Sequence, residues 1–139
     1  NYTKKRYIGA FKTDGSSHVP VIIQNGGYFY YPVMVADYNA TPADTNGHLQ
    51  TLTVPTGFKV KAVLAVGSGN NIAAAVTDPA TTDTAVSSTF FTVSCGSLGG
   101  GSQIEVWTNA SAQVRYRISI SGSLNINTLG YFDPRGTNA

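Results

Sequence analysis

Alternation of apolar and polar residues is the feature that most constrains the fold of this chain. Between Phe58 and Gly67 every second residue is apolar, and Lys59 and Lys61 take intervening positions. Successive side chains of a β-strand point to opposite faces, so a period of two predicts a half-buried strand. Apolar spacing at three and four residues never persists beyond one turn, and Glu105 is the only Glu of the chain. The sequence therefore predicts an all-β protein without surface helices.

About ten such segments follow one another, separated by turn residues. Asn25-Gly26-Gly27 lies between two apolar runs and predicts a hairpin, because Asn and Gly adopt positive φ at little cost. Pro20 and Pro32 cannot donate to a ladder, so each is expected at an edge or a bulge. The polar stretches 37–48 and 78–88 are expected to be loops. The predicted strands are Lys5–Lys12, His18–Gln24, Tyr28–Ala36, Leu49–Val54, Phe58–Gly67, Asn71–Thr77, Phe90–Cys95, Gln103–Asn109, Gln113–Ser121 and Leu124–Phe132.

Short strands at regular spacing predict one β-sandwich domain over residues 1–139, with antiparallel strands and a jelly-roll-like topology as the first choice. No internal repeat of fixed period is present, which disfavours propellers and solenoids. The glycine-rich stretch 96–102 is interpreted as a hairpin loop, because similar strands flank it closely. The predicted core consists of Ile8, Ile22, Val60, Leu64, Val66, Val93, Ile104, Val106, Ile118 and Ile126.

Charge and composition disfavour several classes of partner. Charged residues make up 12% of the chain, the net charge is +2, and the nine cations are scattered, so no nucleic acid is expected as a partner. No apolar stretch reaches the roughly 20 residues of a membrane span, so no membrane insertion is expected. The single cysteine, Cys95, excludes an intrachain disulfide; it is interpreted as a small buried hydrophobe, with an interchain or reactive thiol as the alternative. The chain begins at Asn1 without Met, so we expect a fragment or C-terminal domain of a longer protein.

The titratable residues nominate no catalytic, metal or cofactor site. Five of the seven carboxylates are expected in or beside turns, where Asp caps backbone amides. Glu105 should face outward, opposite Arg115 or Arg117 on a neighbouring strand. Neither His18 nor His48 has a metal ligand at a suitable interval. The chain is therefore expected not to be an enzyme and to need no cofactor. The five turn aspartates are Asp14, Asp37, Asp44, Asp78 and Asp83.

Four consecutive aromatic residues, 28–31, are the most informative candidates for a site. Alternate members of this run must point to opposite faces of a strand, so they cannot all enter one core. The outward rings could pack within the chain, form a subunit interface, or provide a platform for a sugar ring. Trp107 points away from Ile104 and Val106 if its strand is regular, and has the same three interpretations. The candidate interface or ligand aromatics are Tyr28, Tyr30, Tyr31 and Trp107.

Both ends of the chain resemble a known type of module. The opening segment Arg6–Gly15 (RYIGAFKTDG) and the closing segment Leu124–Gly136 (LNINTLGYFDPRG) are similar to the start and end of a β-rich module of bacteriophage virion proteins, including tail fibre and head fibre components. Residues 52–57 and 115–117 lie at compatible places between them. The family's end often carries further basic residues after the Arg-Gly pair, whereas this chain ends at Thr137-Asn138-Ala139, which leaves the role of the terminus open.

The resemblance implies a fibre or spike domain of the virion that is commonly homotrimeric and lies at or near a fibre tip. The expected role is assembly and host-receptor attachment, with further copies of the chain, other virion proteins and a host cell-surface glycan or protein as partners. The expected location is the extracellular particle, after synthesis in the host cytoplasm. The alternatives are a monomeric carbohydrate-binding module with a Tyr/Trp platform and a capsid-type jelly roll that forms a shell. Oligomeric state distinguishes the three.

Overall fold

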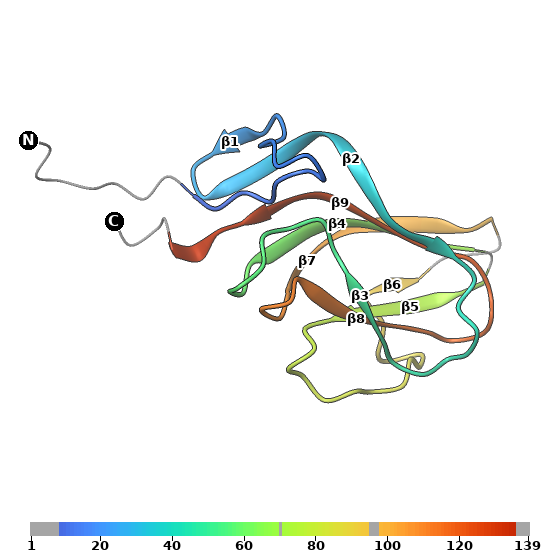
Figure 1. Cartoon of the computed structure of the whole chain (residues 1–139). Coiled ribbons are helices and arrows are strands. Elements are labelled where there is room, and N and C mark those ends of the chain that lie inside the picture. Colours follow the sequence, from blue (N-terminus) through green and yellow to red (C-terminus); the bar gives the residue numbers. More distant parts are fainter. Residues whose placement is uncertain (1–8, 70, 95–97, 136–139) are drawn as a thin grey trace, which may run out of the picture.

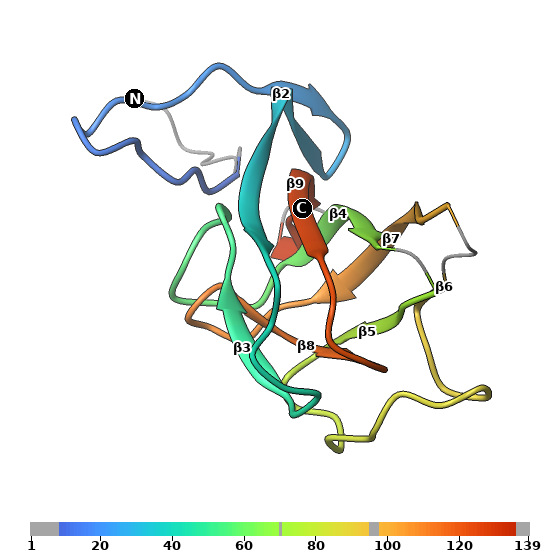
Figure 2. The ribbon, with the colours of Figure 1, turned by 90° about the vertical axis from the view of Figure 1, so that its right-hand side faces the viewer.

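Two antiparallel β-sheets pack face to face in the computed structural model, which describes residues 9–69, 71–94 and 98–135. Figures 1 and 2 show the two layers. Nine strands and no α-helix occur in these residues, so the predicted all-β class is confirmed. The five-stranded sheet has the order β1 (Ile23–Asn25), β2 (Tyr28–Ala40), β9 (Leu124–Phe132), β4 (Lys61–Ser68) and β7 (Gly100–Trp107). The four-stranded sheet has the order β3 (His48–Thr51), β8 (Gln113–Ile118), β5 (Ala73–Thr77) and β6 (Val93–Ser94).

The strands β2 to β9 pair in a nested pattern. β2 pairs with β9, β3 with β8, β4 with β7, and β5 with β6, always antiparallel. Further antiparallel pairs join β4 to β9 and β5 to β8, which completes the two sheets. These four pairs, taken from the outermost to the innermost, belong alternately to the five-stranded and the four-stranded sheet. The eight strands thus have the connectivity of one long hairpin whose successive strand pairs alternate between the two sheets.

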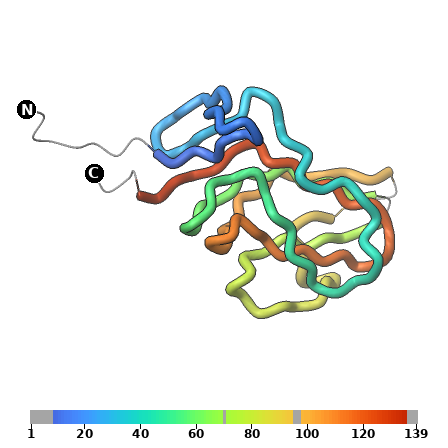
Figure 3. Tube along the Cα trace, viewed as in Figure 1, coloured from blue at the N-terminus to red at the C-terminus, as the bar shows by residue number. Residues whose placement is uncertain are grey.

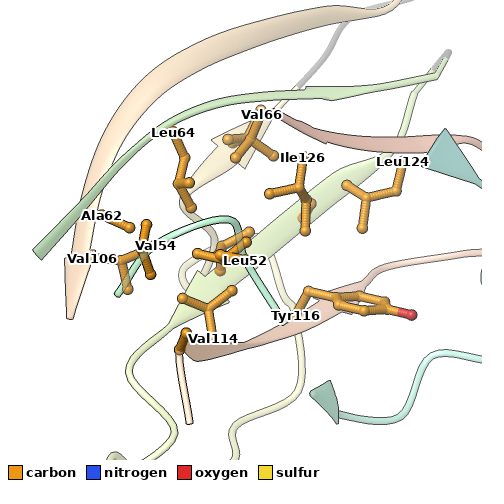
Figure 4. Close-up of a cluster of buried hydrophobic side chains, with 14 of the residues drawn as sticks. Leu52, Val54, Ala62, Leu64, Val66, Val106, Val114, Tyr116, Leu124 and Ile126 are labelled. Carbon is orange, nitrogen blue, oxygen red and sulfur yellow. The ribbon is translucent and has the colours of Figure 1, made fainter. Parts of the chain in front are cut away.

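Alternate residues of both sheets meet in one apolar core, shown in Figure 4. Every second residue from Val60 to Val66 is buried, as the alternation predicted. Leu52 and Val54, which follow β3, are also buried and belong to the same core. Of the predicted core residues, Ile22 and Ile104 are partly buried against the cluster, and Ile8 lies outside the described residues. The other seven are buried: Val60, Leu64, Val66, Val93, Val106, Ile118 and Ile126.

The N-terminal segment differs from its prediction. Residues 9–12, described from the expected strand Lys5–Lys12, join no sheet, and the expected strand His18–Gln24 is reduced to β1. The segment is held instead by side chains, because Phe11 lies edge-on to Phe29 at 5.5 Å and Ala10 N–H donates to the buried carboxylate of Asp133 at 3.2 Å. Gly9 has φ +130°, and a Cβ there would lie 2.4 Å from the Phe29 ring. The opening and closing segments therefore meet at one end of the sandwich, visible in Figure 3.

Turn and loop predictions hold in most places. β1 and β2 form the predicted hairpin, in which Asn25 pairs with Tyr28 and Gly26 has φ +60°. Pro32 lies in the irregular stretch of β2 between Tyr30 and Val35, as expected for a bulge. The expected loop 37–48 begins later, because β2 continues to Ala40. Cys95 and residues 96–97 of the expected glycine-rich loop lie outside the described residues, and residues 100–102 belong to β7.

Two arginines cover the outer face of the four-stranded sheet with loop residues. Arg117 of β8 binds both carboxylate oxygens of Asp83, at 2.6 and 2.9 Å, and the carbonyl oxygen of Thr45 at 3.1 Å. Arg115 donates to the carbonyl oxygens of Thr81 and Pro79, at 2.7 and 2.8 Å. Hydrogen bonds from these two arginines thus hold both predicted loops, 37–48 and 78–88, against β8. Within the described part of the chain, no helix is long and apolar enough to span a membrane.

Candidate aromatic and amide face

The outer face of the five-stranded sheet carries the candidate site, and strand register determines which residues lie on it. Tyr28, Phe132, Lys61 and Trp107 lie opposite one another in a row across β2, β9, β4 and β7. The next row inward along the strands begins with Phe29 and is buried in the core. Because neighbouring rows point to opposite faces of a sheet, the Tyr28 row faces outward.

The outward row forms an aromatic cluster. The ring of Tyr28 lies 5.0 Å from Phe132 and stacks on Tyr30 at 5.8 Å with an interplanar angle of 6°. Lys61 Nζ lies 5.6 Å from the centroid of Phe132 and 5.8 Å from that of Trp107. Trp107 is 37% exposed. A row of aromatic rings, joined by one ammonium group, therefore lies at the surface of the sheet.

Glu105 neutralises the single cation of this cluster. Its carboxylate accepts a hydrogen bond from Lys61 Nζ at 3.0 Å and from the Tyr28 hydroxyl at 3.2 Å. The hydrogen bond to Glu105 raises the pKa of Lys61, and desolvation followed by the contact with Glu105 raises the pKa of Tyr28. The expected pairing of Glu105 with Arg115 or Arg117 is wrong, because β7 pairs with β4 and both arginines belong to the other sheet.

An uncharged groove of about 480 Å³ lies farther along the same face. Its floor is low because Gly67 and Gly101, which pair across β4 and β7, have no side chains. A Cβ at Gly101 would lie only 2.8 Å from the carbonyl oxygen of Val66. The groove is lined by Met34, Ala65, Val66, Gly67, Gly101, Ser102, Gln103, Asn125 and Asn127.

The amide side chains of this groove have free hydrogen-bonding capacity. Asn125 and Asn127 alternate along β9 with the buried Leu124, Ile126 and Thr128. Gln103 lies opposite Ala65, which also pairs with Asn127. Among the described residues, no hydrogen bond joins the side-chain amide of any of the three to another group of the protein, although each amide offers donors and an acceptor.

Of the sequence candidates, Tyr28, Tyr30 and Trp107 lie on the outer face, whereas Tyr31 points to the opposite side of β2. The Tyr31 hydroxyl donates to the carbonyl oxygen of Thr53 at 2.7 Å, and its ring lies 6.4 Å from Tyr131. Burial, and secondly the charge of Asp37, raises the pKa of Tyr31 to about 12. Tyr31 therefore packs within the chain and takes no part in the outer face.

No pattern in the sequence connected Phe132, Lys61 and the three amides with these aromatics. They come from strands 30 to more than 100 residues away from Tyr28, and their proximity depends on the pairing of β2 with β9 and of β9 with β4. A usable signal was the alternation of Asn125 and Asn127 with apolar neighbours, which marks them as outward amides on a half-buried strand.

Each of the seven carboxylates has a structural partner. Asp14, Asp44 and Asp78 accept from backbone N–H groups of their own turns, Asp83 binds Arg117, and Asp133 binds Ala10 N–H. The expected turn position is wrong for Asp37, which lies in β2 at a bulge between Ala36 and Tyr38. The bulge directs its carboxylate toward Thr53, which donates from N–H and hydroxyl at 2.9 and 2.6 Å, and toward the Thr128 hydroxyl.

Histidines also have local partners. His48 Nε2 lies 2.7 Å from Asp44, and this hydrogen bond is the largest cause that lowers the pKa of Asp44 to about 2. His18 lies 3.4 Å from Asp14. In the described ranges, no group of three or more His, Cys, Asp or Glu side chains is placed to hold a metal ion.

Comparison with known proteins adds no further constraint. No protein-family model, no curated protein and no solved structure matches this chain. The function is therefore inferred from the sequence and from the geometry described above.

Proposed function

We propose that this chain is a non-catalytic attachment domain of a bacteriophage virion, of fibre or spike type, which presents the outer face of its five-stranded sheet to a host receptor. The observation that carries the proposal is the surface cluster of Tyr28, Tyr30, Phe132 and Trp107 beside an uncharged groove. Exposed aromatics next to polar groups that fix orientation are typical of recognition surfaces. The virion context rests on the resemblance of the opening and closing segments.

The two sheets differ in a way that supports this assignment. Loops held by Arg115 and Arg117 cover the outer face of the four-stranded sheet. The five-stranded sheet leaves its aromatic and amide residues accessible across β9, β4 and β7. Each carboxylate has a hydrogen-bonding or ionic partner, which favours binding over acid and base chemistry.

We also propose that the sandwich is a jelly roll. The nested pairs β2 with β9, β3 with β8, β4 with β7 and β5 with β6 support this topology, with β1 added as an extra edge strand. Jelly rolls occur both in viral capsid domains and in lectin domains, so this topology is compatible with a shell protein as well as an attachment domain.

A homotrimeric assembly completes the proposal. Four aliphatic side chains at and beside the β1 edge are each more than half exposed. Ile23 lies opposite Tyr30, so this aliphatic patch borders the aromatic cluster. A neighbouring subunit that covers the patch would remove apolar area from water and leave Trp107 and the groove accessible. The patch consists of Val19, Val21, Ile23 and Val33.

Competition for adsorption tests the attachment role. Purified protein in excess should slow adsorption of the phage that encodes it to host cells, because it occupies the receptor. The variant Trp107→Ala should compete at least tenfold less well. Phe91→Ala, which truncates an exposed aromatic two residues before β6 of the other sheet, should compete like the unmodified protein. An unchanged adsorption rate at saturating protein would refute the attachment role.

A carbohydrate-binding module remains the second candidate, because the same exposed rings could stack on sugars in a monomer. A monomeric mass in solution at high protein concentration would favour it over the virion fibre domain.

A further inference from the structure

We infer that the outer face of the five-stranded sheet binds an uncharged oligosaccharide that lies along β4, from the aromatic cluster to the amide groove. This inference rests on the proposed attachment function and specifies the chemical class of its receptor. It is carried by three properties of the face, which are its length, its absence of net charge and its combination of aromatic rings with unpaired amides.

The two parts of the face lie on the same side of β4. Lys61, Val63, Ala65 and Gly67 alternate along this strand, and Val63, between the two parts, is covered by neighbouring side chains. Lys61 belongs to the aromatic cluster, and Ala65 and Gly67 belong to the groove. Six residues of strand span roughly 20 Å. A ligand that contacts both parts is therefore elongated, with several repeating units.

The charge of the face disfavours polyanions. The groove lining contains no ionisable side chain, and the only cation of the aromatic cluster is Lys61, which is paired with Glu105 at 3.0 Å. A nucleic acid or a polyanionic glycan would require several unpaired cations to replace its counterions. The face matches a ligand without charge.

The combination of groups points to sugars. Sugar rings have an apolar side that stacks on aromatic rings and hydroxyl groups at their rims that both donate and accept hydrogen bonds. Tyr28, Phe132 and Trp107 provide the rings, and Asn125, Asn127 and Gln103 provide amides that can donate and accept. An apolar surface placed on the groove would bury these amides without partners, at a cost of about 1–3 kcal/mol for each unsatisfied group.

Trp107 allows a direct test, because it is the only tryptophan of the chain and its fluorescence reports on this face alone. The unmodified full chain is applied to a printed array of neutral and acidic glycans that includes the polysaccharides of the host surface. Neutral glycans that bind are then titrated in solution as fragments of one to six units. We expect a change in Trp107 emission and an affinity that rises at least tenfold between two and five units.

Variants locate the binding site. Trp107→Ala, measured by calorimetry, and Asn125→Ala combined with Asn127→Ala, measured by fluorescence, should each weaken binding at least tenfold. Gln103→Ala should have a smaller effect, because its side chain is more exposed. Phe91→Ala is the matched aromatic control and should bind like the unmodified protein. Unchanged thermal unfolding of each variant establishes that a loss of binding is not a loss of fold.

The outcomes separate this inference from the proposed function. Protein that blocks phage adsorption but binds only acidic glycans, or no glycan, overturns the uncharged oligosaccharide and leaves attachment standing with a different receptor. Neutral glycan binding that persists in the Trp107 and Asn125/Asn127 variants overturns the site. Protein that neither blocks adsorption nor binds any glycan overturns both.

Discussion

At the scale of single residues, the run Tyr28–Tyr31 shows how one strand distributes four rings among three environments. Phe29 is buried beside Phe11 and Tyr131, Tyr31 is half-buried against the core, and Tyr28 and Tyr30 stack on the outer face. Alternation predicted the two directions but not the partners. The partner of Tyr31 is a backbone carbonyl of the segment after β3, and its proximity depends on how the two sheets close.

Tyr31 should couple stability to alkaline pH. Its pKa of about 12 lies above the ordinary value near 10, so the folded state holds the phenolic proton more tightly than the unfolded state. This contribution is complete below pH 10 and is lost as the pH rises from 10 through 12. The difference in unfolding free energy between the unmodified protein and Tyr31→Phe should therefore decrease across that window, as measured by denaturant titration. Ionisation of Tyr31 near pH 10 in NMR titration would contradict the prediction.

At the scale of elements, predictions succeed where local pattern decides the structure. β9 was predicted with its observed bounds, Leu124–Phe132, because Leu124 and Ile126 alternate with two asparagines and turn residues flank the segment. The N-terminal strands were overestimated, because an alternating segment becomes a strand only if a partner edge is available, and the sequence does not show that edge. Asp37 was assigned to a turn for a similar reason, since its bulge depends on the register of β2 with β9.

The candidate site was predictable only in part for the same physical reason. Sequence alternation nominated Tyr28, Tyr30, Tyr31 and Trp107, but it did not decide which side of the aromatic run faces outward. The proximity of side chains depends on the pairing of strands that are far apart in the sequence. This pairing places Phe132 and Lys61 beside the aromatics, and it makes Lys61, instead of an arginine, the partner of Glu105. Sequence alone offered several neighbours for each strand and could not choose among them.

Arg117 should control the order of both long loops on the four-stranded sheet. Arg117→Ala removes the two hydrogen bonds to Asp83 and the one to the Thr45 carbonyl oxygen. Faster backbone hydrogen exchange is expected in residues 41–47 and 78–86, measured by mass spectrometry, while β4 exchanges as before. Lys59→Ala is the control, because Lys59 makes a single, longer contact with Asp78 at 3.4 Å in the same loop. Equal exchange in both variants would show that the loop order does not depend on Arg117.

At the scale of the whole molecule, the aliphatic patch predicts the assembly. Val21→Ser combined with Ile23→Ser should convert a species with three times the mass of one chain into a monomer on dilution, because the patch then gains little from burial. Light scattering measures the mass. Ile120→Ser is the matched control, since Ile120 is 54% exposed and Ile23 57%, and only Ile23 belongs to the patch. A monomeric mass of the unmodified protein at high concentration would refute the trimer.

The nested strand pairing also sets the order in which the protein can be completed during synthesis. Tyr28 and its partner Phe132 are separated by more than one hundred residues, so β2 remains without its principal partner until β9 has left the ribosome. The hairpin of β5 and β6 can close much earlier, because its partners lie about twenty residues apart. The aromatic face is thus among the last parts to form. A ribosome that stops before β9 releases a chain whose sandwich is open and whose β2 edge is free to pair with another chain.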